Sequence, residues 1–331
     1  MDTTKELKKV GTHSGKFHAD EVMATAILKQ VFEIELTRTR DPEILEKQDL
    51  IYDIGNGEFD HHQLEKEYRD NGTPYAACGL IWRKFGRTAI LSNHPEVLEN
   101  EVEIIFRYVD AVLIEGIDAA DNGIRTTENI IPTMCISSII GGYNPTWDSP
   151  ESVDAAFNDA VGFAEDILEN LIDQKVSTLK ARTFVIDAYN NRKRPELLIL
   201  DNSYPWERTL KEIDINKEVL YVIYPKEEGY YIQTVREYGE VRRDRKSLPK
   251  EWAGKREEEL NSVIGINDAI FCHSSRFIAK AGSFESILKM ADIAISKQEH
   301  KVENRITERN VFDILRLILK NKIVIKIRKN R

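Results

Sequence analysis

Apolar residues in the first part of the chain occur in short runs separated by stretches of helical spacing. The runs at 7–12, 34–39 and 50–52 have the length of strands, and between the first two the apolar positions from 22 to 31 share one helix face. Asp41-Pro42 predicts a further helix start, because a capping residue precedes a proline. Strands that alternate with helices form parallel sheets, so we expect a parallel α/β domain.

The pattern changes after residues 141–150, which are dense in turn-forming residues and predict a domain boundary. Residues 151–191 keep helical spacing and predict one long helix that bridges two domains. Short apolar runs then return, at 197–200, 219–224, 230–235 and 269–272, with a helical stretch at 284–295. These runs predict a second, smaller domain of mixed α/β structure.

Composition limits the class of protein. A chain of 331 residues with 41% hydrophobic and 31% charged residues suits two globular domains. The net charge of -9 argues against a uniformly basic surface that coats a polyanion, but it leaves room for a local basic patch. The three cysteines form no CxxC pair, which argues against a disulfide framework or a zinc ribbon and favours a reducing compartment.

The first residues contain no apolar signal segment, and no run of 18 uncharged apolar residues follows. We therefore expect a cytoplasmic protein without an integral membrane segment, with organellar or nuclear targeting left open. The tail from Leu315 to Arg331 has seven basic residues and no acid. A solvated terminus is favoured there over a segment that binds a membrane, a partner or nucleic acid.

Histidines and carboxylates gather in the first 62 residues. The candidate metal ligands there are His13, His18, Asp20, Asp53, Asp60, His61 and His62. Imidazole and carboxylate are the donors that a transition metal or a Mn²⁺ or Mg²⁺ pair uses. His13 and Asp53 end two predicted strands, and the carboxyl ends of parallel strands meet at one edge of a sheet. The sequence therefore predicts a metal site at this edge.

Each of these residues also has an ordinary structural interpretation. Histidines in loops are commonly surface residues, and Asp20 stands where a helix N-cap is expected. The placement at strand ends favours the ligand interpretation for the group as a whole. The segment from Gly11 to Lys16 resembles a phosphate-binding loop, but it is one residue short and is followed by Phe17 in place of Ser or Thr. We therefore exclude nucleoside triphosphate hydrolysis of that type.

A metal pair needs about three ligands for each ion and one shared carboxylate. We assign Asp53 as the shared ligand. One metal is assigned His13 and His18. The other metal is assigned Asp20, His61 and Asp121. Asp118, which shares a helix face with Asp121 before an Asn-Gly stop, is the alternative to Asp121.

The three remaining predictions concern catalysis. Asp53, Asp60 and His62 are the predicted catalytic residues, with Asp60 orienting a histidine through its ring nitrogen. His62 is expected to contact the substrate phosphate or to protonate the leaving group. Two Mn²⁺ or Mg²⁺ ions would activate a water molecule for attack on phosphorus.

Several motifs, in order, resemble the melanocyte-proliferating-gene family. In the first half they are His13-Ser-Gly-Lys-Phe-His18-Ala-Asp20-Glu21, Tyr52-Asp53-Ile-Gly55, Phe59-Asp60-His61-His62-Gln63, Gly79-Leu-Ile-Trp-Arg-Lys-Phe-Gly86 and the stretch from Val109-Asp110 to Asp121-Asn122-Gly123-Ile124. In the second half they include Asn144-Pro-Thr-Trp147, Tyr204-Pro-Trp-Glu207 and Ser247-Leu-Pro-Lys-Glu-Trp252. The resemblance covers about residues 8–297. It implies an N-terminal parallel-sheet catalytic domain of the DHH type, a smaller C-terminal mixed α/β domain, a substrate cleft between them and 3′-to-5′ exonuclease activity on RNA.

The predicted domains follow from these patterns and this resemblance. They are a DHH-like catalytic domain with a two-metal site at 1–143, a linker and long bridging helix at 144–194, a substrate-binding α/β domain at 195–297 and a basic C-terminal extension at 298–331.

The second domain contains candidates for substrate binding. Residues 236–256 include eight basic residues against four acids, with Tyr238 and Trp252 among them. Such a segment can follow a phosphate backbone and stack a base, although a solvated charged loop has the same composition. The candidate substrate-binding residues are Arg242, Arg243, Lys246, Trp252, His273, Ser274 and Arg276. For His273 the competing interpretation is a core histidine.

We therefore expect a metal-dependent phosphodiesterase that acts as a 3′-to-5′ exonuclease on RNA or short oligonucleotides. A small-molecule phosphatase or pyrophosphatase is the alternative enzyme, since the same metal pair serves either reaction. A metal-binding regulator without catalytic activity is the alternative from another class. The sequence leaves open the choice of RNA or DNA, the direction of digestion and whether the chain forms a homo-oligomer.

Overall fold

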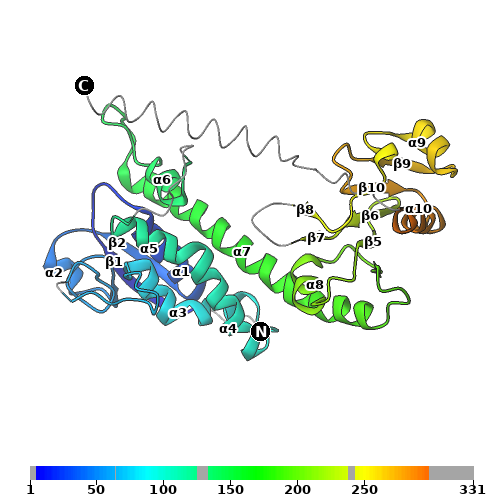
Figure 1. Ribbon diagram of the computed structural model, residues 1–331. Helices are drawn as coiled ribbons and strands as arrows, with labels where there is room; N and C mark the ends of the chain where they lie inside the picture. The colour runs from blue at the N-terminus through cyan, green and yellow to red at the C-terminus, as the bar shows by residue number, and fades with distance from the viewer. Residues whose placement is uncertain (1–4, 64, 125–132, 238–242, 298–331) are drawn as a thin grey trace, which may run out of the picture. The chain divides into compact units, whose positions relative to one another are not determined.

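The computed structural model describes residues 5–63, 65–124, 133–237 and 243–297. The chain divides into two compact units (Figure 1). Unit 1 runs to Asp187 and also takes in Tyr204–Ile213, whereas unit 2 comprises Ala188–Ser203 and the residues from Asp214 onward. Each unit has a hydrophobic core of its own.

Unit 1 contains a small parallel sheet. Strand β1 (Leu7–Thr12) lies between β2 (Glu33–Arg38) and β3 (Leu50–Ile51), and both neighbours run parallel to it. Helix α1 (Ala19–Val31) connects the first two strands. The predicted parallel α/β fold is confirmed, with strand ends within two residues of those expected from the sequence. The other helices of unit 1 are α2 (Pro42–Leu45), α3 (Ala77–Asn93), α4 (Glu99–Val109), the π-helix η1 (Asp110–Ile114), α5 (Glu115–Asp121), α6 (Ile136–Gly141), α7 (Val153–Asn190) and α8 (Glu207–Ile213).

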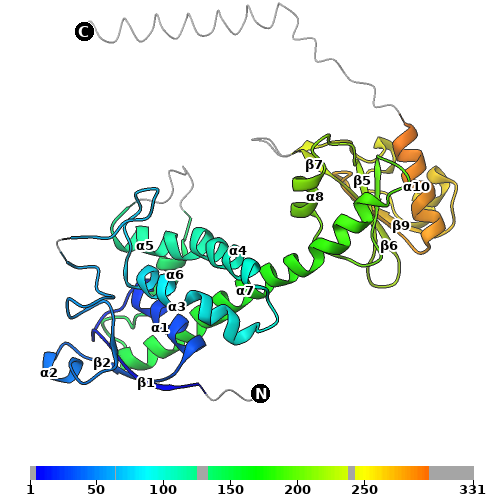
Figure 2. The same cartoon turned by 90° about the horizontal axis from the view of Figure 1, so that it is seen from below.

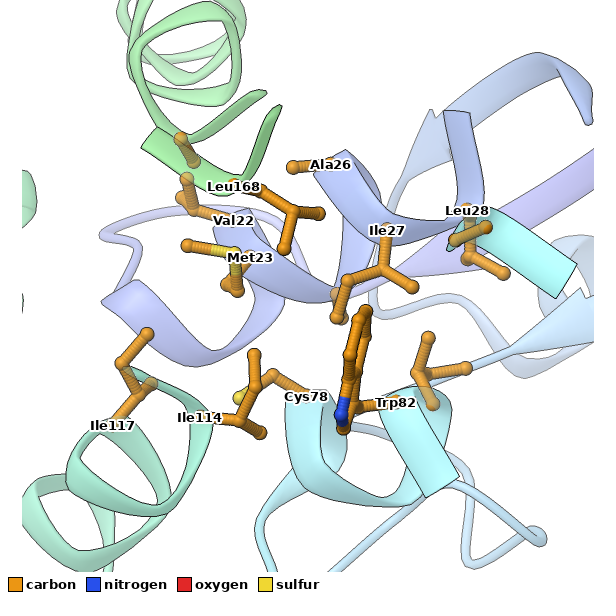
Figure 3. Close-up of a cluster of buried hydrophobic side chains, with 14 of the residues drawn as sticks. Val22, Met23, Ala26, Ile27, Leu28, Cys78, Trp82, Ile114, Ile117 and Leu168 are labelled. Carbon is orange, nitrogen blue, oxygen red and sulfur yellow. The ribbon is translucent and has the colours of Figure 1, made fainter. Parts of the chain in front are cut away.

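Helix α1 forms the centre of the unit 1 core. Ile27 of α1 lies against Trp82 of α3, while Val22 and Met23 lie on the side of Leu168 of α7 (Figure 3). All five of these side chains are fully buried. Removing a side chain of this size from water contributes about 1.5–3 kcal/mol. Packing against α3 and α7 therefore fixes the position of α1 and of His18 and Asp20 at its start.

The sequence predicts helix α7 as a bridge between two domains. In the structure its N-terminal part also belongs to the core of unit 1. Its buried positions recur every three or four residues, at Phe157, Ala160, Val161, Ala164, Leu168, Ile172 and Val176. Such spacing places one helix face against a neighbouring layer. The stretch predicted as a linker and bridging helix thus packs on the first sheet's unit over much of its length, and α7 ends in unit 2.

Unit 2 is a mixed sheet with helices. The strand order is β4-β5-β6-β10-β9, with β4 parallel to β5 and the other pairs antiparallel. Helix α10 lies against β6 and β10 (Figure 2). The predicted mixed α/β structure of this region is confirmed. The elements are β4 (Leu197–Ile199), β5 (Tyr221–Pro225), β6 (Tyr230–Thr234), β7 (Arg236–Glu237), β8 (Arg243–Asp244), the 3-10 helix η2 (Lys250–Trp252), α9 (Glu257–Ile264), β9 (Ala269–Cys272), β10 (Ile278–Ala281) and α10 (Phe284–Ser296).

Among the described residues, none of the helices combines the length and the apolar character needed to cross a membrane. The predicted C-terminal extension at 298–331 lies outside the described residues.

Candidate metal centre

His13 and Asp53 meet at the carboxyl end of the parallel sheet. His13 follows β1 directly, Asp53 comes two residues after β3, and His13 Nε2 lies 3.2 Å from Asp53 Oδ2. Asp53 has a left-handed backbone with φ of 58°. Such a conformation costs about 1–3 kcal/mol for a residue other than glycine, and aspartate tolerates it better than most. The backbone is held there by the bond from Asp53 N to Phe59 O, at 3.0 Å.

The second oxygen of Asp53 contacts a second histidine. Asp53 Oδ1 lies 3.2 Å from His61 Nε2. The same His61 nitrogen is 3.1 Å from Asp121 Oδ2 and 3.7 Å from Asp20 Oδ2. Asp53 therefore lies between two groups of side chains and contacts a different histidine through each oxygen.

Glu21 belongs to this cluster and was not among the residues chosen from the sequence. It lies in the first turn of α1, is fully buried, and its Oε1 is 3.0 Å from His13 Nε2. Oε1 also accepts a hydrogen bond from the backbone N–H of His18, while Oε2 has no hydrogen-bond partner among the described residues. Ligand atoms of His13, His18 and Glu21 lie within 4.8 Å of one another. The sequence signal that could have identified Glu21 was its place next to Asp20, shortly after His18.

The alternative interpretation of Asp20 as the N-cap of its own helix is wrong, because His18 is the N-cap of α1. Asp20 is fully buried and instead accepts hydrogen bonds from the backbone amides of Ala77, at 2.9 Å, and Cys78, at 2.7 Å. These are the first two residues of α3, whose positive helix end favours a carboxylate. Asp20 thus joins the metal-centre cluster to the start of another helix.

The two alternatives on α5 have different partners. Asp121 contacts His61, as described above, whereas Asp118 Oδ2 pairs with Arg69 Nη1 at 2.7 Å. Asp118 Oδ1 also accepts from the backbone amide of Gly79 at 3.0 Å. Burial raises the pKa of Asp118 to about 6 in spite of Arg69. Of the two carboxylates, Asp121 is the one that contacts the histidine cluster.

Asp60 orients His62 rather than His61. Asp60 Oδ1 accepts a hydrogen bond from the backbone N–H of His62 at 3.0 Å and lies 2.9 Å from His62 Nδ1. Asp60 Oδ2 accepts from Asn56 N at 2.7 Å, which fixes the carboxylate. The His62 side chain is 60% exposed, in contrast to the buried His61. The adjacent histidines therefore face different surroundings.

The buried carboxylates of the cluster are stabilised by positive charge, as the pKa values of its members indicate. Burial opposes protonation of His13 and His61, but the hydrogen bonds that they make to carboxylates outweigh it and raise the pKa of each to about 10. Burial also raises the pKa of Asp20 well above its usual value, with Asp53 and Asp121 acting in the same direction. Burial acts in the same sense on Asp53, but its contacts with both histidines outweigh it and lower its pKa to about 2. A divalent cation would supply the charge that these protons supply here.

The donor set fits divalent cations. Imidazole nitrogens and carboxylate oxygens converge on Asp53 from two sides, and one buried Glu21 oxygen is left for a further partner. His13 Nδ1 lies 3.3 Å from the carbonyl oxygen of Ser14 and 3.3 Å from Arg40 Nη2, so it has partners on the loop side while Nε2 faces the carboxylates. Asp20, His61 and Asp121 also bring ligand atoms within 4.8 Å of one another. One or two ions could be held by these residues.

The cluster lines a pocket of about 660 Å³. Three exposed cationic residues, Lys16, Arg40 and Lys66, line the same pocket. Arg40 donates from Nε to the Ser14 carbonyl oxygen at 3.3 Å, and Lys66 donates to Asn122 Oδ1 at 2.7 Å. A neighbouring pocket of about 350 Å³ shares Lys16, His18 and Asp121 with it and is also lined by Asp20. Candidate metal ligands and cationic side chains thus line the same pocket.

The predicted stacking role of Trp252 is wrong. Trp252 is fully buried in the core of unit 2, beside residues such as Tyr221 and Leu260. An indole enclosed in this way has no face for a base. The sequence concealed this burial, because exposed charged residues such as Lys250, Glu251 and Arg256 stand close to Trp252 in the chain.

The other candidates in unit 2 have mixed surroundings. Lys246 Nζ donates to the carbonyl oxygen of Ile295 at 2.8 Å, and Arg276 Nη1 donates to that of Leu248 at 3.0 Å. Both side chains thus help to hold the unit together. Of the other described candidates for substrate binding, Arg243, His273 and Ser274 are exposed. Arg242 lies outside the described residues, so its predicted role stays a prediction.

These features define a class: a two-unit α/β protein with a candidate metal centre of histidines and carboxylates at the carboxyl end of a parallel sheet. A sequence model of MYG1_exonuc, described as "Uncharacterised protein family (UPF0160)", matches residues 9–295. The chain belongs to this family, and the relationship expected from the motifs is confirmed.

Individual relatives extend over most of the chain. The MYG1 protein of Schizosaccharomyces pombe is 31% identical over 318 residues, covering 87% of this chain and 98% of the relative. The MYG1 exonuclease of Homo sapiens is 30% identical and covers 88% of this chain and 87% of the relative. Among solved structures, RecJ from Thermus thermophilus in complex with Mg²⁺ covers 88% of this chain and 50% of its own, at 12% identity. Its TM-score of 0.28 is too low to carry an argument.

Proposed function

We propose that the chain is a metal-dependent phosphodiesterase that acts as a 3′-to-5′ exonuclease on RNA or short oligonucleotides. The observation that carries the proposal is the 660 Å³ pocket, in which a cluster of histidines and carboxylates is joined by three cationic side chains. The cluster suits divalent cations, and the cations Lys16, Arg40 and Lys66 suit a phosphate group. Relatives named MYG1 exonuclease support the same reaction class.

Each ligand has a proposed role. When bound, a divalent metal pair supplies a water of lowered pKa and neutralises charge on a phosphate. Asp53 would be the shared ligand, because its two oxygens lie 3.2 Å from His13 Nε2 and 3.2 Å from His61 Nε2. On the His13 side we add Glu21, which contacts His13 at 3.0 Å, to the predicted ligand His18. On the His61 side Asp121 is preferred to Asp118.

His62 is the proposed proton donor to the leaving oxygen or contact to the phosphate. Its ring is exposed toward the pocket that it lines, while Asp60 holds Nδ1. Because Asp60 occupies Nδ1, the other ring nitrogen is the one that can meet substrate. Mn²⁺ and Mg²⁺ are both proposed as cofactors, since the donor set combines imidazole with carboxylate.

The test is digestion of a single-stranded RNA of about 12 nucleotides, labelled at either end, with Mn²⁺, Mg²⁺ or EDTA. A 3′-to-5′ exonuclease shortens the 5′-labelled RNA stepwise and releases the 3′ label as a mononucleotide at once. DNA of the same sequence measures the preference for ribose. Asp53→Asn should abolish the metal-dependent rate, and equal rates for this variant and the wild type would refute the proposal.

A small-molecule phosphatase or pyrophosphatase is the second candidate, because a pocket of about 660 Å³ has the size of a small-ligand site. Pyrophosphate and a nucleoside monophosphate belong in the same assay. If their kcat/KM exceeds that of the RNA by tenfold or more, this second function replaces the first. If no substrate is turned over although metal binds, a regulator without catalytic activity is the function that remains.

A further inference from the structure

Trp147 is an exposed tryptophan that lies three residues after Asn144, and Asn144 is hydrogen-bonded to the loop at residues 13–18, here called the metal-centre loop. Its side chain is 97% exposed. All four tryptophans lie within the described residues, and the other three are buried: Trp82 and Trp252 fully, and Trp206 at 5% exposure. An indole gains substantially from burial, and the exposed indole of Trp147 is available to a ligand.

The loop that carries Trp147 is fastened to the metal-centre loop. The Asn144 side chain accepts a hydrogen bond from Phe17 N at 3.0 Å and donates to Phe17 O at 2.8 Å. Phe17 lies between Lys16 and His18, which line both pockets. Three residues of chain reach at most about 11 Å. Trp147 therefore stays close to the metal-centre loop.

The turn that carries Trp147 is itself ordered. Ser149 N donates to the carbonyl oxygen of Thr146 at 3.0 Å, which closes a turn around the tryptophan. Asn144 Nδ2 also donates to the carbonyl oxygen of Gly141 at 3.1 Å and so ties the loop to the end of α6. An aromatic side chain on a braced turn loses little freedom when a flat ligand stacks on it.

The pockets lined by the loop that Asn144 holds indicate what that ligand is. They combine candidate metal-binding carboxylates with Lys16 and Arg40, a combination suited to a phosphate. A nucleotide chain has a phosphate and, a few ångströms away, a flat base. Pyrophosphate and other small phosphates have no aromatic face to offer. We propose that Trp147 stacks on a base of a single-stranded nucleic acid whose phosphate lies in the metal-centre pocket, an inference that rests on the proposed function.

Kinetics on two oligomers test this. The substrates are a single-stranded RNA of about 12 nucleotides and an abasic ribose-phosphate oligomer of equal length. Base stacking on an aromatic side chain corresponds to a loss of about 5- to 150-fold on truncation. We expect Trp147→Ala to raise KM for the RNA in this range with little change in kcat, and Trp147→Phe to restore most of the loss. KM for the abasic oligomer should stay the same in both variants.

Ile215→Ala is the matched control, because Ile215 is a large apolar residue of unit 2 with 83% exposure. It should change neither KM. The stacking proposal is overturned if Trp147→Ala behaves like this control on RNA. It is also overturned if Trp147→Ala weakens both oligomers equally, because the tryptophan would then act on the backbone or on the loop.

Fluorescence separates this inference from the proposed function. Trp147 is the one solvent-exposed indole among four tryptophans that are all described, so stacking of a base should quench the exposed fraction of the emission. In the titration the same RNA is added to the protein, with Ca²⁺ as the divalent cation. Trp147→Phe should remove the quenching. If RNA quenches Trp147 but is never cleaved, the proposed hydrolysis fails and the stacking stands. If RNA is cleaved without quenching of Trp147, the stacking fails and the hydrolysis stands.

Discussion

The two neighbouring histidines, His61 and His62, differ in burial and partners although they are adjacent in sequence. His61 Nε2 meets three carboxylates in the buried cluster, whereas His62 is exposed and held by Asp60. Asp53 lies between these surroundings, 3.2 Å from His61 and 3.6 Å from His62 Nδ1. The proposed roles of His61 as a metal ligand and of His62 as a substrate contact can therefore be tested separately by mutation.

We expect His61→Asn to weaken binding of Mn²⁺ by more than about 100-fold, because loss of outer-shell partners alone typically costs 10–100-fold. His62→Asn should bind Mn²⁺ within about threefold of the wild type, while kcat falls by roughly 10²–10⁴, the range for general acid catalysis. Calorimetric titration with Mn²⁺ and steady-state kinetics on RNA measure the two effects. Equal loss of metal in both variants would contradict this division.

At the scale of elements, two carboxylates hold the start of α3. Asp20 accepts from the first two backbone amides and Asp118 from that of Gly79, the third residue. Asp118 is balanced by Arg69, which also makes a two-pronged contact with Asp110 at the start of η1. A helix start, a π-helix and the metal centre therefore share one buried polar network.

Gly79 is required by this network. A Cβ at this position would lie 1.9 Å from Asp118 Oδ2, closer than atoms can approach. We expect Gly79→Ala to destabilise the protein by about 1–3 kcal/mol, as overpacked sites do. Gly162→Ala is the control, because nothing lies within 4 Å of its Cβ in α7, and it should stabilise by about 0.4–1 kcal/mol. Urea unfolding of both variants should give shifts of opposite sign.

In unit 2 the buried pair of Asp214 and Arg245 predicts a dependence on pH. Asp214 is 2% exposed and accepts hydrogen bonds from Arg245, from Val219 N at 3.1 Å and from Glu218 N at 3.1 Å. Burial opposes ionisation, but these bonds outweigh it and hold the pKa of Asp214 below its usual value. A carboxyl whose pKa is lower in the folded state stabilises at neutral pH and loses this contribution as pH falls through the folded pKa.

We expect Asp214→Asn to lose about 3 kcal/mol of stability at pH 7, as when one partner of a buried pair is removed. The difference from the wild type should shrink as pH falls below the unfolded pKa of about 3.9. Asp201→Asn, at an exposed position of the same unit, serves as the control. Urea midpoints between pH 7 and pH 2 measure the difference. A gap that stays constant over this range would show that charge on Asp214 is not the cause.

At the scale of the whole molecule, two separate cores predict separate responses to metal. The candidate ligands all belong to unit 1, and unit 2 has its own buried core. A ligand that binds only the folded state adds about 2.7 kcal/mol at one hundred times its Kd. Adding Mn²⁺ should therefore raise the unfolding temperature of unit 1, and EDTA should lower it.

Scanning calorimetry with and without Mn²⁺ makes this measurement. We expect one transition to move with the metal while the transition of unit 2 stays in place. His61→Asn should remove most of the movement, since His61 contacts three carboxylates of the cluster. Two transitions that move together would show that the units unfold as one. If neither transition moves, the proposed metal site in unit 1 is refuted.

Much of the molecule could be read from local pattern. Strands β1, β2 and β3 and helix α7 lie within two residues of the stretches that periodicity predicted, because burial of one face imposes its period on the sequence. The meeting of His13 and Asp53 also followed, since parallel strands end at a common edge. These inferences need only the chain's own neighbours and the rules of sheet topology.

Contacts between distant segments decided the rest. Asp20 caps a helix 57 residues away, and of the two aspartates on α5 only the fold distinguishes Asp121, beside His61, from Asp118, beside Arg69. Contacts between distant segments likewise place Glu21 in the cluster and Trp252 in the core of unit 2. The sequence by itself determined which elements form and which chemistry gathers at the sheet edge. The tertiary structure alone decided which way each polar side chain points, because packing and buried hydrogen bonds select its partner from residues far along the chain.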